Sequence, residues 1–316
     1  MDRYAQRAAE VVRQAGRALF GKEREIREVL LSILAGGHIL LEDIPGVGKT
    51  TLAMAFSKTL DLDYRRVQFT PDVLPSDLTG FSVYRREREA FVYQPGIVFC
   101  NLLLADELNR TSPKTQSALL EAMQEGQVTA EGVTRKLPEP FLVIATQNPL
   151  GSAGTQPLPE SEADRFAVSL SLGYPDLESE LSMARSVGIT RPVDNLSPIL
   201  SRDELAAIQT AIHDVYIHDK VYRYLAELVR ATRDHALLLQ GAGPRATIAL
   251  VKLSKAAAWY EGRDFVTPSD VLGQFPYVAA HRLTRNADAV ARHVTVREIL
   301  RQIAGTVRKP PIEARR

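Results

Sequence analysis

One stretch, Asp-Ile-Pro-Gly-Val-Gly-Lys-Thr-Thr at residues 43–51, constrains the fold of this chain more than any other. An apolar run at 39–41 precedes it, and the apolar residues within 52–56 that follow have helical spacing. The stretch is therefore predicted to turn from a strand into a helix. Glycines in such a turn let backbone N–H groups converge on phosphate oxygens, and the helix N-terminus adds positive potential. The sequence thus predicts a phosphate-binding loop formed by Pro45, Gly46, Val47, Gly48, Lys49, Thr50 and Thr51.

Individual side chains of this loop have distinct expected roles. Lys49 can reach the β and γ phosphates of a nucleotide, and the Thr50 hydroxyl can bind Mg²⁺. One position departs from the pattern G-x-x-x-x-G-K-[ST], because Asp43 stands where the first glycine is expected. A carboxylate beside a triphosphate is unfavourable unless it points away. Asp43 is therefore expected to cap the turn or to pair with a cation.

Bulk properties narrow the class of protein. The 316 residues are enough for two domains, and 39 basic against 38 acidic residues give a net charge of +1. This total does not indicate a nucleic-acid or membrane-surface binder. The single cysteine, Cys100, excludes an intrachain disulfide and a thiolate metal cluster. No apolar stretch reaches the roughly 20 residues that span a bilayer, and charges interrupt any signal-peptide core near the N-terminus. We therefore expect a cytoplasmic protein without membrane insertion.

Short apolar runs and turn residues divide the first 175 residues into alternating elements. Amphipathic patterns predict helices over 4–18 and 25–35, and Ser112-Pro113 is typical of a helix start. Paired apolar arms predict two hairpins inserted among these elements, at 81–95 with a charged tip and at 127–137. Apart from the strand at 39–41, strands are predicted at 64–69, 102–105, 142–146 and 167–172.

From residue 176 onward the pattern is helical throughout. Ser201 with Glu204 and Thr295 with Glu298 form capping boxes that mark helix starts. Arg245 lies near the start of another predicted helix, where a positive charge is unfavourable, so we expect an anion to offset it. The predicted architecture is an α/β P-loop domain with a parallel central sheet at 1–175, a smaller all-helical domain at 176–308 and a flexible tail at 309–316.

A second chemical feature is a pair of carboxylates at the end of the buried strand 102–105. Asp106 and Glu107 follow that strand directly. On a sheet that also carries a phosphate loop, an acid at a strand end lies where Mg²⁺ and the γ phosphate would sit. Asp106 would then hold the metal, and Glu107 would be the base that activates water. Asn148, at the end of the strand 142–146, could contact that water or the γ phosphate, but Asn148 before Pro149 is equally typical of a turn.

These features occur in the order found in AAA+ ATPases, and longer stretches resemble one family of them, the MoxR family. The resemblance rests on Gln-Phe-Thr-Pro-Asp-Val-Leu-Pro-Ser-Asp-Leu-Thr-Gly at 68–80, on 104–125, which contains Leu-Ala-Asp-Glu-Leu-Asn-Arg, and on Ala-Thr-Gln-Asn-Pro at 145–149. Leu-Pro-Glu at 158–160 and Asp-Arg-Phe at 164–166 fit as well. The resemblance covers nearly the whole chain.

The resemblance implies roles for further residues. Asn148 would be the sensor-1 residue, and Arg245 would be the sensor-2 residue of the helical lid, acting on the nucleotide of its own chain. Arg165 would be an arginine finger that reaches the ATP of a neighbouring subunit, with Arg110 as a rival for that role. Phe20, Gly21 and Lys22 would border the adenine. The hairpins would be a helix-2 insert and a pre-sensor-1 hairpin that project toward the central pore or a partner.

The sequence also departs from the family in two places. Members usually have Gln near Lys22 and Ser near Gly243, which affects the adenine and lid contacts rather than the chemistry. An acid at the position of Asp43 is common in the family.

The function that the resemblance implies is Mg²⁺-dependent ATP hydrolysis by a hexameric ring. Such a ring would remodel or mature a client protein complex in a chaperone-like way, often with a partner bearing a von Willebrand factor A domain. A nucleic-acid motor and the motor subunit of a metal chelatase are alternatives, and a nucleotide-dependent interaction switch is a third. The balanced charge argues against nucleic acid as a partner.

Overall fold

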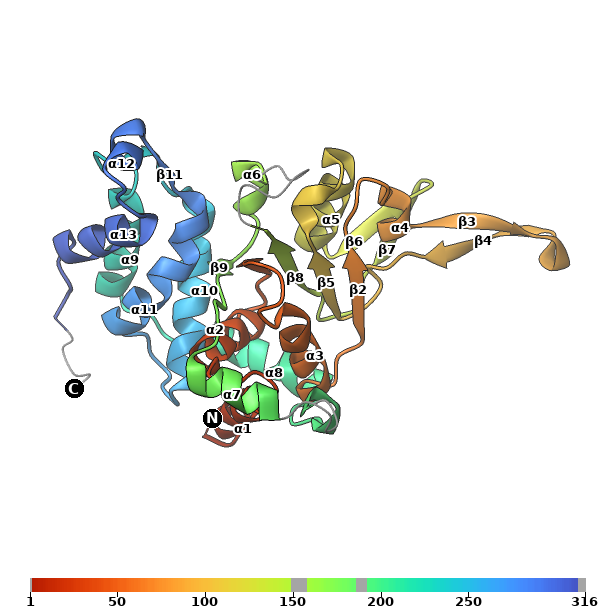
Figure 1. Cartoon of the computed structure of the whole chain (residues 1–316), viewed down its shortest axis with the longest axis horizontal. Coiled ribbons are helices and arrows are strands. Elements are labelled where there is room, and N and C mark those ends of the chain that lie inside the picture. Colours follow the sequence, from red (N-terminus) through yellow and green to blue (C-terminus); the bar gives the residue numbers. More distant parts are fainter. Residues whose placement is uncertain (1, 149–157, 186–191, 312–316) are drawn as a thin grey trace.

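The computed structural model describes residues 2–148, 158–185 and 192–311. Its centre is a five-stranded parallel sheet in the order β2-β5-β8-β1-β9 (Figure 1). All five strands expected from the sequence are present, with ends shifted by at most two residues. Because the strands are parallel, their carboxyl ends meet at one edge of the sheet. The strands are β1 (Ile39–Glu42), β2 (Tyr64–Gln68), β5 (Leu102–Asp106), β8 (Leu142–Gln147) and β9 (Val168–Leu170).

Both faces of the sheet are covered, which explains why its inner strands are continuous apolar runs. Ile39 and Leu41 point into a core shared with α1 (Asp2–Gly16), α2 (Glu23–Leu34) and α3 (Lys49–Thr59). Leu40 and Val143 point the other way, into a core shared with α5 (Pro113–Glu125). The short helix α4 (Pro75–Thr79) contributes Leu78 to that second core, and Leu158 and Phe166, which flank α6 (Glu160–Ala163), contribute as well. Ser112 caps α5 as predicted, accepting a hydrogen bond from Thr115 N.

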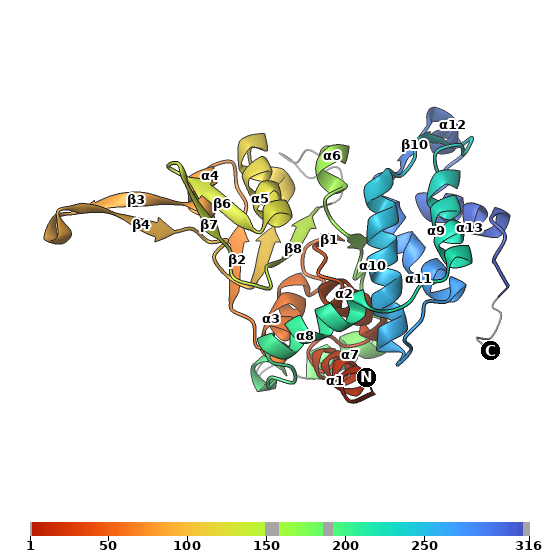
Figure 2. The same ribbon diagram turned by 180° about the vertical axis from the view of Figure 1, so that it is seen from behind.

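Both predicted hairpins are confirmed by their strand pairing. The larger one joins β3 (Gly80–Arg85) to β4 (Ala90–Pro95) through the 3₁₀ turn η1 (Arg86–Arg88) and projects far from the body of the molecule (Figures 1 and 2). At its base the chain crosses itself closely, because a Cβ on Gly96 would lie 2.0 Å from the Leu78 carbonyl oxygen. The smaller hairpin joins β6 (Gln127–Ala130) to β7 (Val133–Lys136) and turns at Glu131-Gly132, both with positive φ.

The smaller hairpin braces the larger one. Glu131 accepts hydrogen bonds from the backbone N–H of Ser82, at 2.9 Å, and from its hydroxyl. The Arg135 guanidinium stacks 3.6 Å from the ring centroid of Tyr93. Farther along β3 and β4, Tyr84 and Phe91 form an exposed edge-to-face aromatic pair.

Helices dominate the remainder, as the sequence predicted, and the Ser201 and Thr295 capping boxes are both formed. The pattern did not reveal a short antiparallel pair, β10 (Leu238–Gln240) with β11 (Thr284–Arg285), because each strand is too short to show an alternating pattern. The expectation of helix throughout is corrected at these residues. The helices are α7 (Leu177–Arg185), α8 (Arg202–His213), α9 (Asp219–Ala231), α10 (Pro244–Tyr260), α11 (Pro268–Ala279), α12 (Ala287–Ala291) and α13 (Val296–Thr306), with the 3₁₀ turns η2 (Leu108–Arg110), η3 (Pro192–Asn195) and η4 (Ala280–Arg282).

The helices after 176 occupy two places. Figure 1 shows α7 and α8 beside α1 and α3, whereas α9 to α13 form a separate group in which α10 packs against α2. α8 contacts both α2 and α10, so it connects the two groups. The domain boundary near residue 175 stays a prediction. Of the expected tail, 309–311 lie beyond the last helix, and 312–316 fall outside the described residues.

Two further expectations concern Cys100 and the membrane. Cys100 is buried, and burial raises the pKa of its thiol to about 12, so it is a packing residue without thiolate chemistry. Within the described ranges, no helix is both long and apolar enough to cross a bilayer.

Candidate functional site

The loop between β1 and α3 has the conformation that phosphate binding requires. Gly46 and Gly48 have φ of 88° and 99°, a region that side chains disfavour. Lys49 is buried, and its Nζ donates to the Asp43 carbonyl oxygen at 2.9 Å. Burial lowers the pKa of Lys49, while the nearby carboxylates of Asp106, Asp43 and Glu107 oppose that shift. The lysine thus lies among acids at the start of α3, whose N-terminal N–H groups face the loop.

The Asp43 side chain, which stands where the motif has a glycine, points away from the phosphate loop, as expected from the sequence. Its carboxylate accepts hydrogen bonds from Ser171 Oγ at 2.8 Å, from Gly173 N at 3.1 Å and from Leu172 N. These donors lie just beyond the carboxyl end of β9. Asp43 therefore ties the phosphate loop to the segment that leads from the sheet into α7. It pairs with backbone and hydroxyl donors rather than with the cation that the sequence suggested as one option.

Asp106 lies at the carboxyl end of β5, beside the phosphate loop. Thr146 Oγ1 donates to its Oδ1 at 2.7 Å, and Arg66 Nη2, from β2, pairs with its Oδ2 at 2.7 Å. The register Ala105↔Ala145 puts Thr146 next to Asp106. Thr146 and Arg66 were not identified as site residues from the sequence. Each lies one or two residues before the end of a strand that pairs with β5, and this position is the signal that could have identified them.

Glu107 is fixed by three contacts. Its backbone is left-handed, with φ of 56°, and its N–H donates to Thr146 Oγ1 at 2.8 Å. Asn148 Nδ2 donates to Glu107 Oε1 at 3.0 Å, and Arg110 Nη1 pairs with Oε2 at 2.6 Å. Asn148 Oδ1 is buried without a hydrogen-bond partner among the described residues. The structure thus brings the predicted acid and amide together and leaves an acceptor for a ligand or water.

The segment around Gly21 lies against the phosphate loop. Leu19 Cδ2 is 3.4 Å from the point where a Cβ on Gly48 would lie. A Cβ on Gly21 would fall 2.3 Å from Ser179 Oγ of α7, so only glycine fits there. Lys22 Nζ donates to the carbonyl oxygens of Leu172 and Tyr174 at 2.6 and 2.8 Å. The predicted adenine border, including Phe20, therefore lies between the loop, the end of β9 and α7.

The donor set at this edge fits Mg²⁺. Thr50 supplies a hydroxyl from the first turn of α3, and Asp106 supplies a carboxylate. Mg²⁺ prefers such hard oxygen ligands, and in nucleotide sites it takes one or two from protein and the rest from phosphates and water. The described residues contain no group of three or more His, Cys, Asp or Glu side chains that could hold a metal without a nucleotide.

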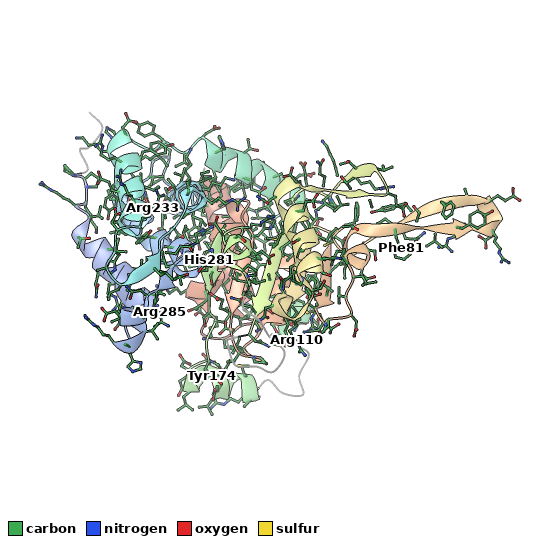
Figure 3. All side chains as sticks on the ribbon, turned by 90° about the horizontal axis from the view of Figure 1, so that it is seen from above. Phe81, Arg110, Tyr174, Arg233, His281 and Arg285 are labelled. Carbon is green, nitrogen blue, oxygen red and sulfur yellow. The ribbon has the colours of Figure 1, made fainter. Side chains whose placement is uncertain are left out.

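Arg165 and Arg245 lie at the opposite edge of the sheet. Ala167 N donates to the carbonyl oxygen of His38, the residue before β1, at 2.8 Å. A cavity of about 320 Å³ has His38, Arg165 and Arg245 in its lining. The phosphate loop follows β1, so the length of that strand separates it from these arginines. Figure 3 labels one residue near each edge of the sheet: Arg110 near the phosphate loop and His281 near Arg165. His281 Nε2 lies 3.1 Å from the Phe166 carbonyl oxygen.

Asp164 is the anion that offsets Arg245 at the start of α10. Arg245 Nη1 lies 3.6 Å from Asp164 Oδ2, and Arg282 Nε, which the sequence did not reveal, donates to Asp164 Oδ1 at 2.7 Å. Arg165 Nε is buried without a hydrogen-bond partner among the described residues. The structure thus places the two predicted arginines in the lining of one cavity, away from the phosphate loop of their own chain.

Comparisons with known proteins agree with this arrangement. The family model "ATPase family associated with various cellular activities (AAA)" matches residues 38–168, and "AAA lid domain" matches 230–303. The chain is 38% identical to "Chaperone MoxR1" of Mycobacterium tuberculosis over 94% of this chain and 81% of that protein. The chain belongs to the MoxR family of AAA+ ATPases.

Two other similar proteins cover almost the whole of this MoxR-family chain. "Uncharacterized protein YeaC" of Bacillus subtilis is 42% identical over 95% of this chain and 93% of its own. The crystal structure of a putative ATPase from Cytophaga hutchinsonii, 40% identical, matches with a TM-score of 0.90 over 98% of this chain and 96% of that one. Membership in an ATPase family supports ATP hydrolase activity, and the parallel sheet with its helical lid is the fold expected for it.

Proposed function

We propose that this MoxR-family chain hydrolyses Mg²⁺-ATP between the subunits of a hexameric ring and uses the energy to remodel a client protein complex. The observation that carries this proposal is the division of the site between two edges of one sheet. The phosphate loop, the acid pair and Asn148 lie at the carboxyl edge, whereas Arg165 and Arg245 lie at the amino edge. A head-to-tail ring would bring these two edges together from neighbouring subunits.

The residues at the carboxyl edge divide the chemistry among them. Lys49 and the backbone N–H groups of the loop bind the phosphates, and Thr50 with Asp106 would hold Mg²⁺. The metal, when bound, neutralises charge on the phosphate oxygens. Glu107 is the general base that takes a proton from the attacking water, and Asn148 orients that water through its unpaired Oδ1. Arg110 must release the Glu107 carboxylate before it can act as a base.

The arginines at the amino edge supply positive charge to the neighbour. Arg165 is partly exposed and lines the cavity at this edge, so a neighbouring subunit packed there could present its phosphates to the guanidinium. Arg245 shares that edge, so we propose that it too acts on the neighbour's nucleotide, in place of the action within its own chain that the family resemblance implied. Arg110 is less suited to act in trans, because it already pairs with Glu107 of its own chain.

Mixed rings test whether Arg165 acts in trans. Arg165→Ala subunits keep a phosphate loop, and Lys49→Ala subunits keep the arginine. Each variant alone should lose most ATPase activity, by roughly 10³-fold or more for the finger. Random mixing places a working loop beside a working arginine at about one interface in four, so activity should partly return. Activity that stays at the level of the single variants at every mixing ratio would contradict the proposal.

The client is approached through a hydrolysis-deficient ring. The chaperone-named relative supports a remodelling role, and the projecting β3–β4 hairpin is suited to contact a client outside the body of the ring. A ring of Glu107→Gln subunits should stay bound to both ATP and the client. We propose a cytoplasmic client complex and a partner with a von Willebrand factor A domain. Both should co-purify with the Glu107→Gln ring in ATP and leave it in ADP. Equal recovery in both nucleotides would argue against remodelling.

A further inference from the structure

The buried Arg282, at the end of η4, holds the backbone on both sides of Arg165. Its side chain is only 3% exposed. Nη2 donates to the carbonyl oxygens of Asp164 and Phe166 at 3.0 and 2.6 Å, the residues that directly precede and follow Arg165. Nη1 donates to Ala167 O at 3.3 Å, and Nε donates to the Asp164 carboxylate at 2.7 Å. One lid side chain thus binds three of the four residues 164–167, on both sides of Arg165.

Arg282 is also linked to Arg245. The Asp164 carboxylate that accepts from Arg282 also pairs with Arg245, so the two arginines share one anion. A second contact from η4 reinforces the link, because His281 Nε2 lies 3.1 Å from Phe166 O. Arg282 also donates to the Val278 carbonyl oxygen at the end of α11. The position of α11 and η4 therefore sets the position of both arginines.

We propose that Arg282 is a positioning residue through which the lid of one subunit places Arg165 and Arg245 for hydrolysis in the neighbouring subunit. The inference rests on the proposed trans action of Arg165. A movement of α11 and η4 relative to the sheet shifts the carbonyl groups that flank Arg165. Because a misplacement of about 1 Å can cost about 10²-fold in rate, the lid of each subunit then controls its neighbour's turnover. Lid position and hydrolysis at the next site are coupled through this one guanidinium.

The test uses Arg282→Lys in mixed rings. Lysine keeps the charge but has no planar fork, so it cannot bind Asp164, Phe166 and Ala167 together. The variant alone should lose ATPase activity by roughly 10²-fold while keeping ATP affinity, because its own phosphate loop is intact. Mixed with Lys49→Ala, it should recover in the same way as Arg165→Ala does. Mixed with Arg165→Ala, it should not recover, because neither subunit then supplies a placed arginine.

A matched control separates positioning from stability. Arg263 forms a comparable lid ion pair with Asp270 at 2.6 Å, at the start of α11. Arg263→Lys should show a similar fall in melting temperature. It should not behave in mixed rings as either a loop-deficient subunit such as Lys49→Ala or an arginine-deficient subunit such as Arg165→Ala. Asp164→Asn, which keeps a polar side chain, is the second variant if Arg282→Lys does not fold, and it should also recover only with Lys49→Ala.

The outcomes distinguish this inference from the proposed function. Recovery of Arg165→Ala with Lys49→Ala, but none of Arg282→Lys with Lys49→Ala, would overturn the positioning role alone. Recovery of Arg282→Lys with Arg165→Ala would also overturn it, because the two residues would then act at different sites. If Arg165→Ala does not recover with Lys49→Ala, the trans arginine itself is wrong, and the positioning role is overturned with it.

Discussion

Replacing Asp43 with alanine is expected to loosen the join between the phosphate loop and the end of β9. The change leaves the N–H groups of Leu172 and Gly173 without their acceptor. A donor left unpaired away from water costs about 1–3 kcal/mol, so the two together cost about 2–6 kcal/mol of local stability. That loss should lower the hydrogen-exchange protection of these two amides by about 30-fold to on the order of 10⁴-fold.

Hydrogen–deuterium exchange with mass spectrometry measures this effect on a peptide that covers 168–174. A peptide from α13 should exchange as in the unchanged protein. Asp43→Asn should lose less protection, because it keeps one acceptor oxygen. Asp72→Ala is the matched control, since it removes the same charge from an exposed position. Unchanged exchange at 168–174 in Asp43→Ala would refute the structural role assigned to Asp43.

Asp43 also distinguishes the ATP affinity predicted from the structure from the affinity predicted from the motif alone. Asp43→Gly restores the general G-x-x-x-x-G-K-[ST] pattern, so the motif alone predicts equal or tighter ATP binding. The structure predicts weaker binding, because the loop loses its anchor to the segment beside Gly21. Titration of a fluorescent ATP analogue distinguishes the two, and tighter binding by Asp43→Gly would show that the carboxylate hinders the phosphates.

Three further changes test separate parts of the structure. Thr146→Val removes the hydroxyl between Asp106 and Glu107, and should lower steady-state ATPase activity by roughly 10- to 100-fold; an unchanged rate would show that this contact is dispensable. Gly96→Ala pushes a methyl against Leu78 O, and should lower the melting temperature and increase proteolysis in the β3–β4 hairpin; wild-type resistance would contradict the close crossing. His38 is partly buried, and desolvation lowers its pKa to about 4 from about 6.5 in the unfolded chain, so stability present above pH 6.5 is lost as pH falls toward 4, by up to about 3 kcal/mol. The free energy of urea unfolding should depend less steeply on pH in His38→Gln than in the unchanged protein. An identical dependence in both would show that His38 is not the source of this loss of stability.

The parts of the fold that the sequence predicted correctly depend on local interactions. The phosphate loop, the helix caps at Ser112 and Ser201 and the turn at Glu131-Gly132 each need only neighbouring residues. The five strands were found because buried parallel strands are continuous apolar runs. The acid Glu107 and the amide Asn148 met as expected, since parallel strands end at one edge.

The features that the sequence did not reveal depend on partners far along the chain. Asp43 looked unexplained because its donors lie beyond β9, at 171–173. The sequence showed that Arg245 needed an anion but could not identify Asp164, nor that Arg282 shares it. No local pattern marks Arg282, because a lone arginine in a helix is usually a solvated surface residue. The placement of Arg245 away from its own phosphate loop likewise follows from how the lid packs.

The most direct test of the central claim is ATP turnover by Glu107→Gln compared with the unchanged protein. The account predicts that the unchanged protein hydrolyses Mg²⁺-ATP, and that the variant binds ATP with similar affinity but turns over at least roughly 10²-fold more slowly, because glutamine cannot accept the proton from water. Affinity and phosphate release should be measured on the same preparation. Turnover by Glu107→Gln at the rate of the unchanged protein would contradict the assignment of Glu107 as the base at this site.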